Sequence, residues 1–219
     1  MPVPSKTRRY DASARRAAAE QTRDRVLAAA KNLFVSQGYA GTSVAEVAER
    51  AGVSVDTVYA SAGRKPRLLL TVVDMVLASS SRPEPAEERD YVRSVRAARD
   101  GGDKIRTYAD ALGRLMPTVA PLLLALRDAG LTDPDCRATW DHVNERRAAN
   151  MLLFAADLRA TGELREDLTD QDVADLVWST NSPEWFDAYT SRGRDAAAYS
   201  RALTDLWTRT LLAQPVAQE

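Results

Sequence analysis

The chain is nearly devoid of cysteine and histidine, with Cys136 and His142 as the single residue of each type among 219. One cysteine cannot form an intrachain disulfide, which is typical of proteins kept in a reducing cytoplasm. One histidine excludes zinc sites that need several His or Cys ligands, and it leaves few ways to build a His-dependent nucleophilic triad. We therefore expect no metal site.

Long apolar runs are also missing. The longest, around residues 72–77 and 121–126, fall far short of the ~20 residues that a membrane-spanning helix needs. The N-terminal stretch is basic but has no apolar core, so it does not fit a secretory signal. These absences predict a soluble cytoplasmic protein with no membrane partner.

Glycine-rich phosphate-binding loops of the Walker or Rossmann type do not occur. The segment Gly63-Arg64-Lys65 lacks the upstream glycine of a Walker motif. Carboxylates are abundant, but no pair of them is marked out by its surroundings. The sequence thus predicts no catalytic residues, no cofactor and no enzymatic activity.

The net charge of −1 conceals a strong asymmetry along the chain. Residues 1–70 carry 12 Lys and Arg residues against 6 Asp and Glu residues, a charge of +6. Residues 71–219 carry 18 against 25, a charge of −7. An averaged charge argues against a polyanionic partner, whereas the basic N-terminal part favours one.

The hydrophobic pattern is helical almost throughout, and no strand-like alternation persists over a useful length. Glycine, proline and capping residues divide the chain into expected helices. Four belong to the N-terminal part: a helix at 20–37 that ends at Gly38, two short helices that begin after Ser43 and Ser54, and a further helix from Pro66. The rest lie at 84–99, 103–116, 118–129, 134–160, 170–181, 183–191 and 195–213, with one of the breaks at Pro117.

The predicted architecture is all-α, with an N-terminal three-helix helix-turn-helix domain followed by a larger helical ligand-binding and dimerisation bundle. Residues 1–19 are basic and poor in apolar side chains, so we expect a flexible arm there. Residues 20–66 would form the helix-turn-helix domain and residues 67–219 the effector-binding and dimerisation domain.

The segment from Thr42 to Lys65 carries the functional signal. The small residue Ala48 allows a second helix to cross closely, Gly52 permits the bend, and Val58 anchors the second helix on the first. This spacing is typical of a helix-turn-helix, whose second helix presents a polar face to a DNA major groove. From the spacing alone, an ordinary pair of packed helices is about as good an interpretation. The basic charge of this end favours DNA.

Residues 20–77 resemble the N-terminal domain of the TetR/AcrR family of transcriptional regulators. The matching string runs from Leu33-Phe34-Val35-Ser36-Gln37-Gly38-Tyr39 through residues 42–54 to Thr57-Val58-Tyr59 and Lys65. The family usually has an aromatic residue three positions after the recognition-helix tyrosine, where this chain has Ala62. Packing between the recognition helix and the next helix is therefore expected to differ from the family pattern.

The resemblance implies which residues face DNA. Base and phosphate contacts are expected from the start of the recognition helix, and further phosphate contacts from the start of the second and fourth helices. The candidates are Thr42, Ser43, Ser54, Val55, Asp56, Thr57, Tyr59, Arg64 and Lys65. Capping alone would also explain Ser43, and a role at the helix N-terminus explains Asp56 better than a base contact does. Arg8, Arg9, Arg15 and Arg16 either reach a minor groove or only raise non-specific affinity.

The resemblance also implies an effector pocket among the middle helices and a homodimer built from the helices at 170–181 and 195–213. The residues expected to line the pocket mix large apolar surfaces with a few polar groups: Tyr108, Leu112, Met116, Trp140, Asn144, Met151, Phe154, Trp178 and Asn181. Residues of this kind are more often ordinary core than ligand contacts. The dimer would use Val173, Leu176, Val177, Leu203, Leu206, Trp207, Leu211 and Leu212, which fit a core as well.

The resulting hypothesis is a transcriptional regulator that binds double-stranded operator DNA as a homodimer. Release from a pseudo-palindromic operator by a small molecule is the family's usual mode and makes a repressor the favoured interpretation. The alternative is a helical small-molecule-binding protein, or an enzyme, without specific DNA binding.

Overall fold

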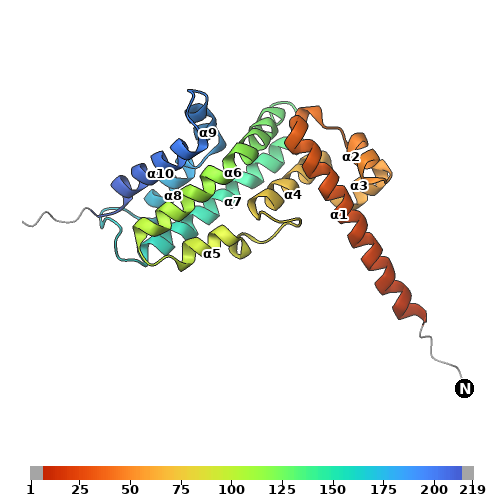
Figure 1. Cartoon of the computed structure of the whole chain (residues 1–219), viewed down its shortest axis with the longest axis horizontal. Helices are drawn as coiled ribbons and strands as arrows, with labels where there is room; N and C mark the ends of the chain where they lie inside the picture. Colours follow the sequence, from red (N-terminus) through yellow and green to blue (C-terminus); the bar gives the residue numbers. More distant parts are fainter. Residues whose placement is uncertain (1–6, 214–219) are drawn as a thin grey trace, which may run out of the picture.

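The described part of the chain is built from α-helices (Figure 1). The computed structural model describes the backbone of residues 7–213 and the side chains of residues 13–213. Within this range there are ten α-helices and no β-strand, with a single isolated bridge between Leu164 and Leu212. The predicted all-α fold is confirmed.

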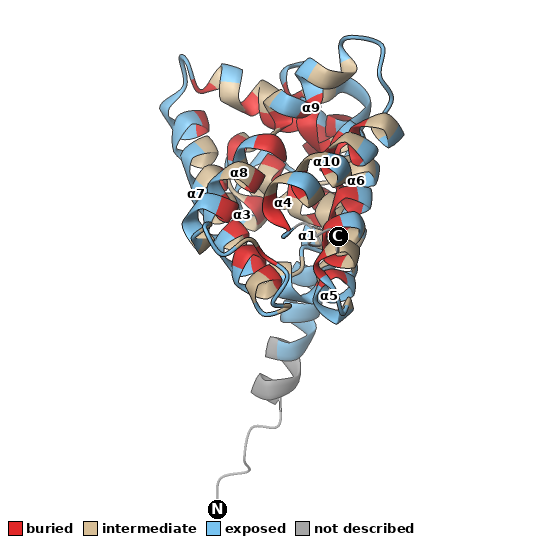
Figure 2. Cartoon of the chain, turned by 90° about the vertical axis from the view of Figure 1, so that its left-hand side faces the viewer, coloured by how far each residue is buried: buried red, intermediate tan, exposed pale blue. Residues whose placement is uncertain are grey.

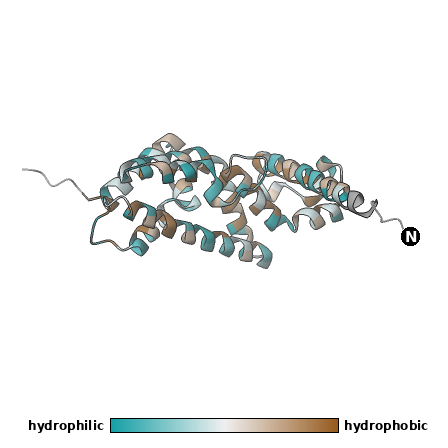
Figure 3. Ribbon diagram, turned by 90° about the horizontal axis from the view of Figure 1, so that it is seen from below, coloured by the Kyte–Doolittle hydropathy of each residue, from teal (hydrophilic) through white to brown (hydrophobic). Residues whose placement is uncertain are grey.

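The N-terminal unit contains four helices, and the remaining six form a bundle beside it. The first four are α1 (Thr7–Gly41), α2 (Val44–Ala51), α3 (Val55–Ala62) and α4 (Lys65–Leu77). The bundle contains α5 (Asp90–Ala97), α6 (Gly101–Ala129), α7 (Pro134–Arg159), α8 (Asp170–Thr180), α9 (Pro183–Thr190) and α10 (Ala196–Leu211). Hydrophilic and hydrophobic residues interchange along these helices, as expected when each buries one side (Figure 3).

Two apolar cores hold the molecule together. The first joins α1 to α4 and also takes in Val119, Leu122 and Leu126 from α6 and Val143 from α7. The second lies within the bundle, around Tyr199 and other buried side chains of α6, α7, α8 and α10. The helix-turn-helix unit therefore shares its core with the C-terminal part of α6 and the N-terminal part of α7.

Helix α6 runs through the centre of the bundle and packs against α10, α7, α9 and α5, as well as against α1 and α4. It is the one described helix long and apolar enough to cross a membrane, but half of its most apolar stretch is buried in the bundle. Burial against six neighbouring helices explains that composition, so α6 is the core helix of the fold.

The first helix begins earlier than the sequence predicts. Residues 7–19, expected to be a flexible arm, continue α1 toward the N-terminus, while residues 1–6 lie outside the described range. Residues 13–20 are exposed on a stretch that extends away from the body of the molecule (Figure 2). The prediction was wrong because it required apolar packing, whereas an alanine- and arginine-rich stretch continues a helix by intrinsic propensity.

The predicted break at Pro117 is also wrong. Helix α6 is continuous from Gly101 to Ala129 and contains both Pro117 and Pro121. Each proline removes one backbone hydrogen bond, which usually ends or kinks a helix. Here both prolines are exposed while Met116, Val119 and Leu122 beside them are buried, so packing on the apolar side holds the helix together.

The predicted helix at 84–99 is divided in two. A short 3₁₀ turn at Ala86–Glu88 precedes α5, and Arg89 between them has an extended backbone with φ −66° and ψ 137°. The Arg89 side chain is buried and pairs with Asp74 of α4. The predicted helix is thus interrupted at Arg89, the residue whose side chain enters the interior.

Candidate DNA-binding surface and effector cavity

Helices α2 and α3 each begin at a capping serine, and α2 ends at a glycine. Ser43 and Glu46 form a capping box at the start of α2, with Ser43 N donating to Glu46 Oε2 at 2.7 Å and Glu46 N donating to Ser43 Oγ at 3.1 Å. These hydrogen bonds lower the pKa of Glu46. Gly52 ends α2 in the left-handed conformation, with φ 66° and ψ 43°, and Ser54 caps α3. The sequence therefore fixes this helix-turn-helix locally.

The outer face of α3 is exposed. Tyr59 is 46% exposed and Val55 36%, and Asp56 is exposed beside them. Val58 and Ala62 on the opposite face are buried in the core shared with α1 and α4. An exposed apolar side chain and an exposed tyrosine on a short helix are available to a partner such as a DNA groove.

Three of the predicted DNA contacts already have partners inside the protein. Thr42 is 2% exposed and its hydroxyl donates to the Gly38 carbonyl at 2.9 Å, so its side chain cannot reach a phosphate in this conformation. The Ser54 and Thr57 hydroxyls lie 2.8 Å apart and hydrogen-bond to each other. The Ser54 oxygen also accepts from Thr57 N at 3.2 Å. For these residues the capping role is established by geometry, and DNA contacts stay predictions.

Ala62 occupies the position where the family usually has an aromatic residue. Its side chain is buried in the N-terminal core. Gly63 follows with φ 79°, and a Cβ added there would lie 3.0 Å from Arg67 Cδ. The stem of Arg67 on α4 therefore lies against Gly63 at the end of α3.

Arg64 and Lys65 lie at the joint between α4 and the bundle. Arg64 Nη1 pairs with Asp135 Oδ2 of α7 at 2.5 Å, in an exposed ion pair. Lys65 Nζ lies 4.2 Å from the centre of the Tyr39 ring, and partial burial lowers the pKa of Lys65. Tyr39 in turn hydrogen-bonds to Cys136 Sγ at 3.2 Å. The first turn of α7 is thereby fixed to the helix-turn-helix unit.

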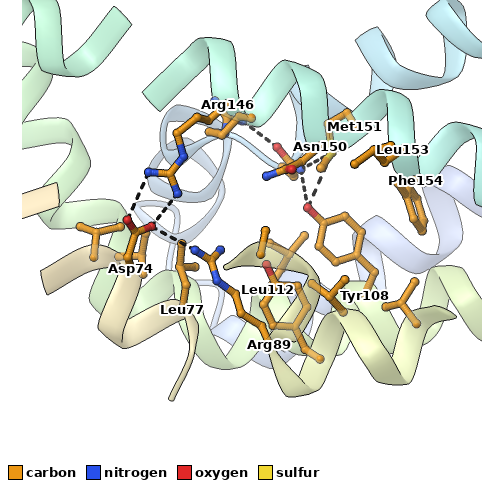
Figure 4. A pocket seen from close by; sticks show the side chains of 18 of the residues that line it. Asp74, Leu77, Arg89, Tyr108, Leu112, Arg146, Asn150, Met151, Leu153 and Phe154 are labelled. Atoms are coloured by element: carbon orange, nitrogen blue, oxygen red, sulfur yellow. Dashed lines mark hydrogen bonds and ion pairs between the residues drawn. The ribbon is translucent and has the colours of Figure 1, made fainter. Parts of the chain in front are cut away.

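A cavity of about 180 Å³ lies between α4, α5, α6 and α7. Its wall is mainly apolar, with Leu77, Leu112, Leu153 and Phe154 among the side chains shown in Figure 4. Such a hollow, lined by large apolar groups with a few polar ones, has the character of a small-molecule site. No group of three or more His, Cys, Asp and Glu side chains that could hold a metal occurs in residues 13–213.

A partly buried ion cluster lies in the cavity wall. Asp74 of α4 accepts from Arg146 of α7, with Oδ1 2.7 Å from Nη2 and Oδ2 3.1 Å from Nη1, and from Arg89 Nη2 at 3.0 Å (Figure 4). The bidentate pair raises the pKa of Arg146. The carboxylate of α4 is thus the single link between two guanidinium groups on the cavity wall.

A second polar group in the wall is a chain of hydrogen bonds that starts at the Arg147 guanidinium and runs through neutral side chains. Arg147 Nη2 donates to Asn181 Oδ1 at 2.6 Å, and Asn181 Nδ2 donates to the Tyr108 hydroxyl at 2.9 Å. The Tyr108 hydroxyl points to Met151 Sδ at 3.6 Å. A thioether is a weak acceptor, so the phenolic proton is available to a stronger acceptor in the cavity.

The structure brings six of the nine predicted effector residues together on the cavity wall: Tyr108, Leu112, Met116, Met151, Phe154 and Asn181. The other three lie elsewhere. Trp140 packs against the N-terminal core, Trp178 packs against the bundle core under the Arg147 guanidinium, and the Asn144 side chain accepts from Arg147 at 3.2 Å. Asn144 and Trp178 therefore support a wall residue, while Trp140 belongs to the joint between the units.

Among the charged residues of the cavity, the sequence suggests only Arg147, which with His142 is a weaker candidate because a His or Arg on a helix usually points into solvent. Arg147 lines the cavity, whereas His142 is exposed. Asp74 had one visible signal, since it is the only charged residue within the apolar run from Leu68 to Leu77. Nothing in the sequence pairs it with Arg89 or Arg146, because that pairing joins three different elements.

Comparison with known proteins finds a family model that matches the N-terminal unit. Residues 26–72 match the family described as "Bacterial regulatory proteins, tetR family". This range covers most of the helix-turn-helix unit, from α1 into α4. The resemblance seen in the sequence is confirmed. A search of curated proteins found no match.

Solved structures show the same fold over nearly the whole chain. A TetR-family transcriptional regulator from Rhodococcus sp. is 18% identical, with a TM-score of 0.64 over 88% of this chain and 99% of that one. A transcriptional regulator from Saccharomonospora viridis, solved with choline, is 15% identical, with a TM-score of 0.67 over 89% and 100%. FadR from Bacillus subtilis, solved with stearoyl-CoA, is 16% identical, with a TM-score of 0.62 over 83% and 95%. At these identities the similarity concerns the fold.

Proposed function

We propose that this chain is a transcriptional regulator of the tetR family, whose model residues 26–72 match, and that it acts as a ligand-responsive repressor. In this proposal it binds a pseudo-palindromic operator as a homodimer, and a small molecule releases it. The observation that carries the proposal is the combination of an exposed recognition-helix face with a mainly apolar cavity, joined by α4. Such a protein acts on DNA in the cytoplasm.

The DNA-binding part of the proposal rests on α3. Tyr59, Val55 and Asp56 are exposed on one face of a helix that is held by caps and by a buried opposite face. We propose that this face enters the major groove, with the Tyr59 hydroxyl donating to a phosphate. Lys65, and Ser43 at the start of α2, would add backbone contacts. Arg15 and Arg16 lie on exposed turns of α1, and Arg8 and Arg9 lie outside the described side chains.

The response to a ligand is supported by the position of α4. This helix follows the recognition helix directly, and it contributes Leu70, Val73, Asp74 and Leu77 to the cavity wall. Two of the neighbouring folds were solved with small molecules, choline and stearoyl-CoA. A ligand that binds better to the form with displaced recognition helices weakens DNA binding by the same factor that DNA weakens its own binding.

The proposed dimer would use α8 and α10. Most of their predicted apolar residues, including Val173, Val177, Leu203 and Trp207, are buried within the single chain and belong to its core. Leu176 and Leu206 are partly exposed. They remain as the residues through which a second copy would pack, placing two recognition helices one DNA turn, ~34 Å, apart.

The deciding experiment is selection of bound fragments from genomic DNA, followed by titration of the selected fragment across a salt series. We expect binding that persists with excess competitor DNA and weakens steeply with salt. Small molecules that are substrates or products of the proteins encoded beside the selected fragment are then added, and one of them should release the protein from the DNA. Binding that is equal for all sequences, or absent, would favour a helical small-molecule-binding protein or enzyme without specific DNA binding.

A further inference from the structure

The cavity wall has an excess of positive charge. Its charged groups that are not exposed are two carboxylates, Asp74 and Asp157, and three guanidinium groups, those of Arg89, Arg146 and Arg147. Asp157 is paired at 3.0 Å with Lys104, which lies outside the wall, and the exposed wall residues Glu87 and Arg96 are opposite in sign. Among the described residues, Asp74 is therefore the one wall carboxylate left for three guanidinium groups, and partly buried cations that lack an anion are costly unless a further anion is bound.

Arg89 is the first of the incompletely paired cations. It is 2% exposed, shares the Asp74 carboxylate with Arg146, and leaves its Nε buried without a hydrogen-bond partner in the described part of the chain. A buried guanidinium N–H without an acceptor costs free energy that an incoming acceptor would recover. The backbone also leaves the helical conformation at this residue to place the side chain here.

Arg147 is the second such cation. Its three hydrogen-bond acceptors are neutral: Asn144 Oδ1, the Trp178 carbonyl and Asn181 Oδ1. No carboxylate pairs with it within residues 13–213, and burial lowers the pKa of Arg147. The same chain ends at the Tyr108 hydroxyl, which donates only to a thioether. Around Arg147 and Tyr108 the cavity therefore has hydrogen-bond donors but, among the described residues, no anionic hydrogen-bond acceptor.

We propose that the effector of this regulator is an amphipathic organic anion, with an anionic head on the arginines and an apolar body between Leu112, Met116 and Phe154. The head takes the place of the Asp74 carboxylate on Arg89 and Arg146. This inference rests on the proposed function, since it identifies the class of ligand for that cavity. A carboxylate fits because it reproduces the planar, bidentate geometry that Asp74 now supplies.

The exchange of one carboxylate for another has a direct consequence for α4. Asp74 supplies the ion pairs between the C-terminal half of α4 and both α7 and the segment before α5. A ligand carboxylate that occupies both guanidinium groups frees Asp74, and with it the C-terminal half of the helix that follows the recognition helix. Ligand charge and the position of α4 are therefore coupled through a single ion cluster.

The test compares three probes of equal chain length by isothermal titration calorimetry, in the absence of DNA: octanoate, 1-octanol and octylamine. At pH 7 they are anionic, neutral and cationic. We expect octanoate to bind about tenfold or more tightly than either of the others, the ratio that one charge-assisted hydrogen bond gives. Equal affinities, or tighter binding of octylamine, would overturn the inference.

Two variants examine the exchange itself, with circular dichroism to confirm that each is folded. Asp74→Asn should raise octanoate affinity about tenfold, because the competing carboxylate is gone, and octanoate should raise its Tm more than that of the unaltered protein. Arg89→Gln should lower octanoate affinity by a similar factor. Arg93→Gln, an exposed arginine one turn further on, is the matched control and should leave it unchanged.

The octanoate affinity of Asp74→Asn shows whether the ligand carboxylate replaces that of Asp74 or whether Asp74 only stabilises the fold. If Asp74 only stabilises the fold, octanoate affinity falls or stays the same in this variant, and the inference is overturned. Failure of the proposed function has a different signature, which is loss of sequence-specific DNA binding in the salt titration. Because the calorimetry contains no DNA, its result does not depend on that titration.

Discussion

At the scale of single residues, Tyr59 is the clearest candidate for a DNA contact. Its ring is about half exposed, and its hydroxyl makes no hydrogen bond within the described part of the chain. Neighbouring Ser54 and Thr57 have already paired with each other, so their hydroxyls are less available. The sequence lists all three as equivalent candidates, and only the hydrogen bonds separate them.

Removing the Tyr59 hydroxyl should therefore weaken DNA binding without affecting the fold. We expect Tyr59→Phe to lower affinity for the selected operator by about 2- to 10-fold, the value of one net hydrogen bond, with an unchanged Tm. Fluorescence anisotropy with labelled DNA measures the affinity. Tyr189→Phe, on α9 of the bundle, is the control and should bind normally. Equal affinities of the two variants would remove Tyr59 from the DNA contacts.

Gly38, at a kink within α1, and Gly52, at the end of α2, should respond differently to substitution. Gly52 has φ 66° and ψ 43°, a left-handed conformation that costs a side chain roughly 1–2 kcal/mol. Gly38 has φ 74° and ψ 175°, a region essentially restricted to glycine. An added Cβ would meet nothing within 4 Å at Gly38 and only Arg25 Nη1, at 3.9 Å, at Gly52. Backbone strain alone therefore decides the outcome.

Urea unfolding should show Gly38→Asn to be more damaging than Gly52→Asn. Asparagine tolerates the left-handed region, so we expect a loss of less than about 1 kcal/mol at Gly52 and about 2–3 kcal/mol at Gly38. Both variants keep the same side chain, so each serves as the control for the other. Similar losses at the two positions would contradict the assigned backbone conformations.

At the scale of whole helices, α6 contains prolines at two interior positions. Pro121 is exposed, and in a helix interior it costs up to about 3 kcal/mol relative to alanine. We expect Pro121→Ala to raise the free energy of unfolding by about 1–3 kcal/mol, measured by urea denaturation. Pro134→Ala is the matched control, because Pro134 lies in the first turn of α7, where proline is favourable. A loss of stability in Pro121→Ala would show that the proline geometry is needed by the bundle.

The helix boundaries show which features local sequence patterns can predict. Caps at Ser43, Ser54, Thr169, Ser182 and Asp195 mark helix starts close to the predicted ones, because a cap is a contact between neighbours in sequence. The failures at Pro117 and Arg89 have the opposite cause. Helix α6 continues through Pro117, and the predicted helix at 84–99 is interrupted at Arg89, because of contacts with residues distant in sequence. A local sequence pattern carries no information about such contacts.

At the scale of the molecule, the basic N-terminal part and the acidic bundle should give a steep salt dependence to DNA binding. Lys65→Gln removes one proposed phosphate contact from each copy of the chain. Since each contact contributes about 0.9 to the slope of log affinity against log salt, we expect the slope to become shallower by about 1.8 for a bound dimer. The measurement is the same anisotropy titration over a salt series.

The size of that change tests assembly as well as contact. A decrease near 0.9 would indicate one chain per site and would argue against the proposed homodimer. No decrease would mean that Lys65 serves only to cover the Tyr39 ring, from which its Nζ is 4.2 Å distant. Sedimentation equilibrium of the DNA complex provides an independent count of chains.

The sequence by itself determined the all-α class and the helix-turn-helix, and it revealed the family resemblance, because caps, glycine turns and apolar spacing act between residues close together in the chain. Six of the nine residues that it suggested for an effector pocket do line the cavity, most of them large side chains on the middle helices. Only the tertiary structure decided which charges enter the cavity. Asp74, Arg89 and Arg146 meet because three elements pack together there, and the physical reason is the cost of burying a charge without a partner.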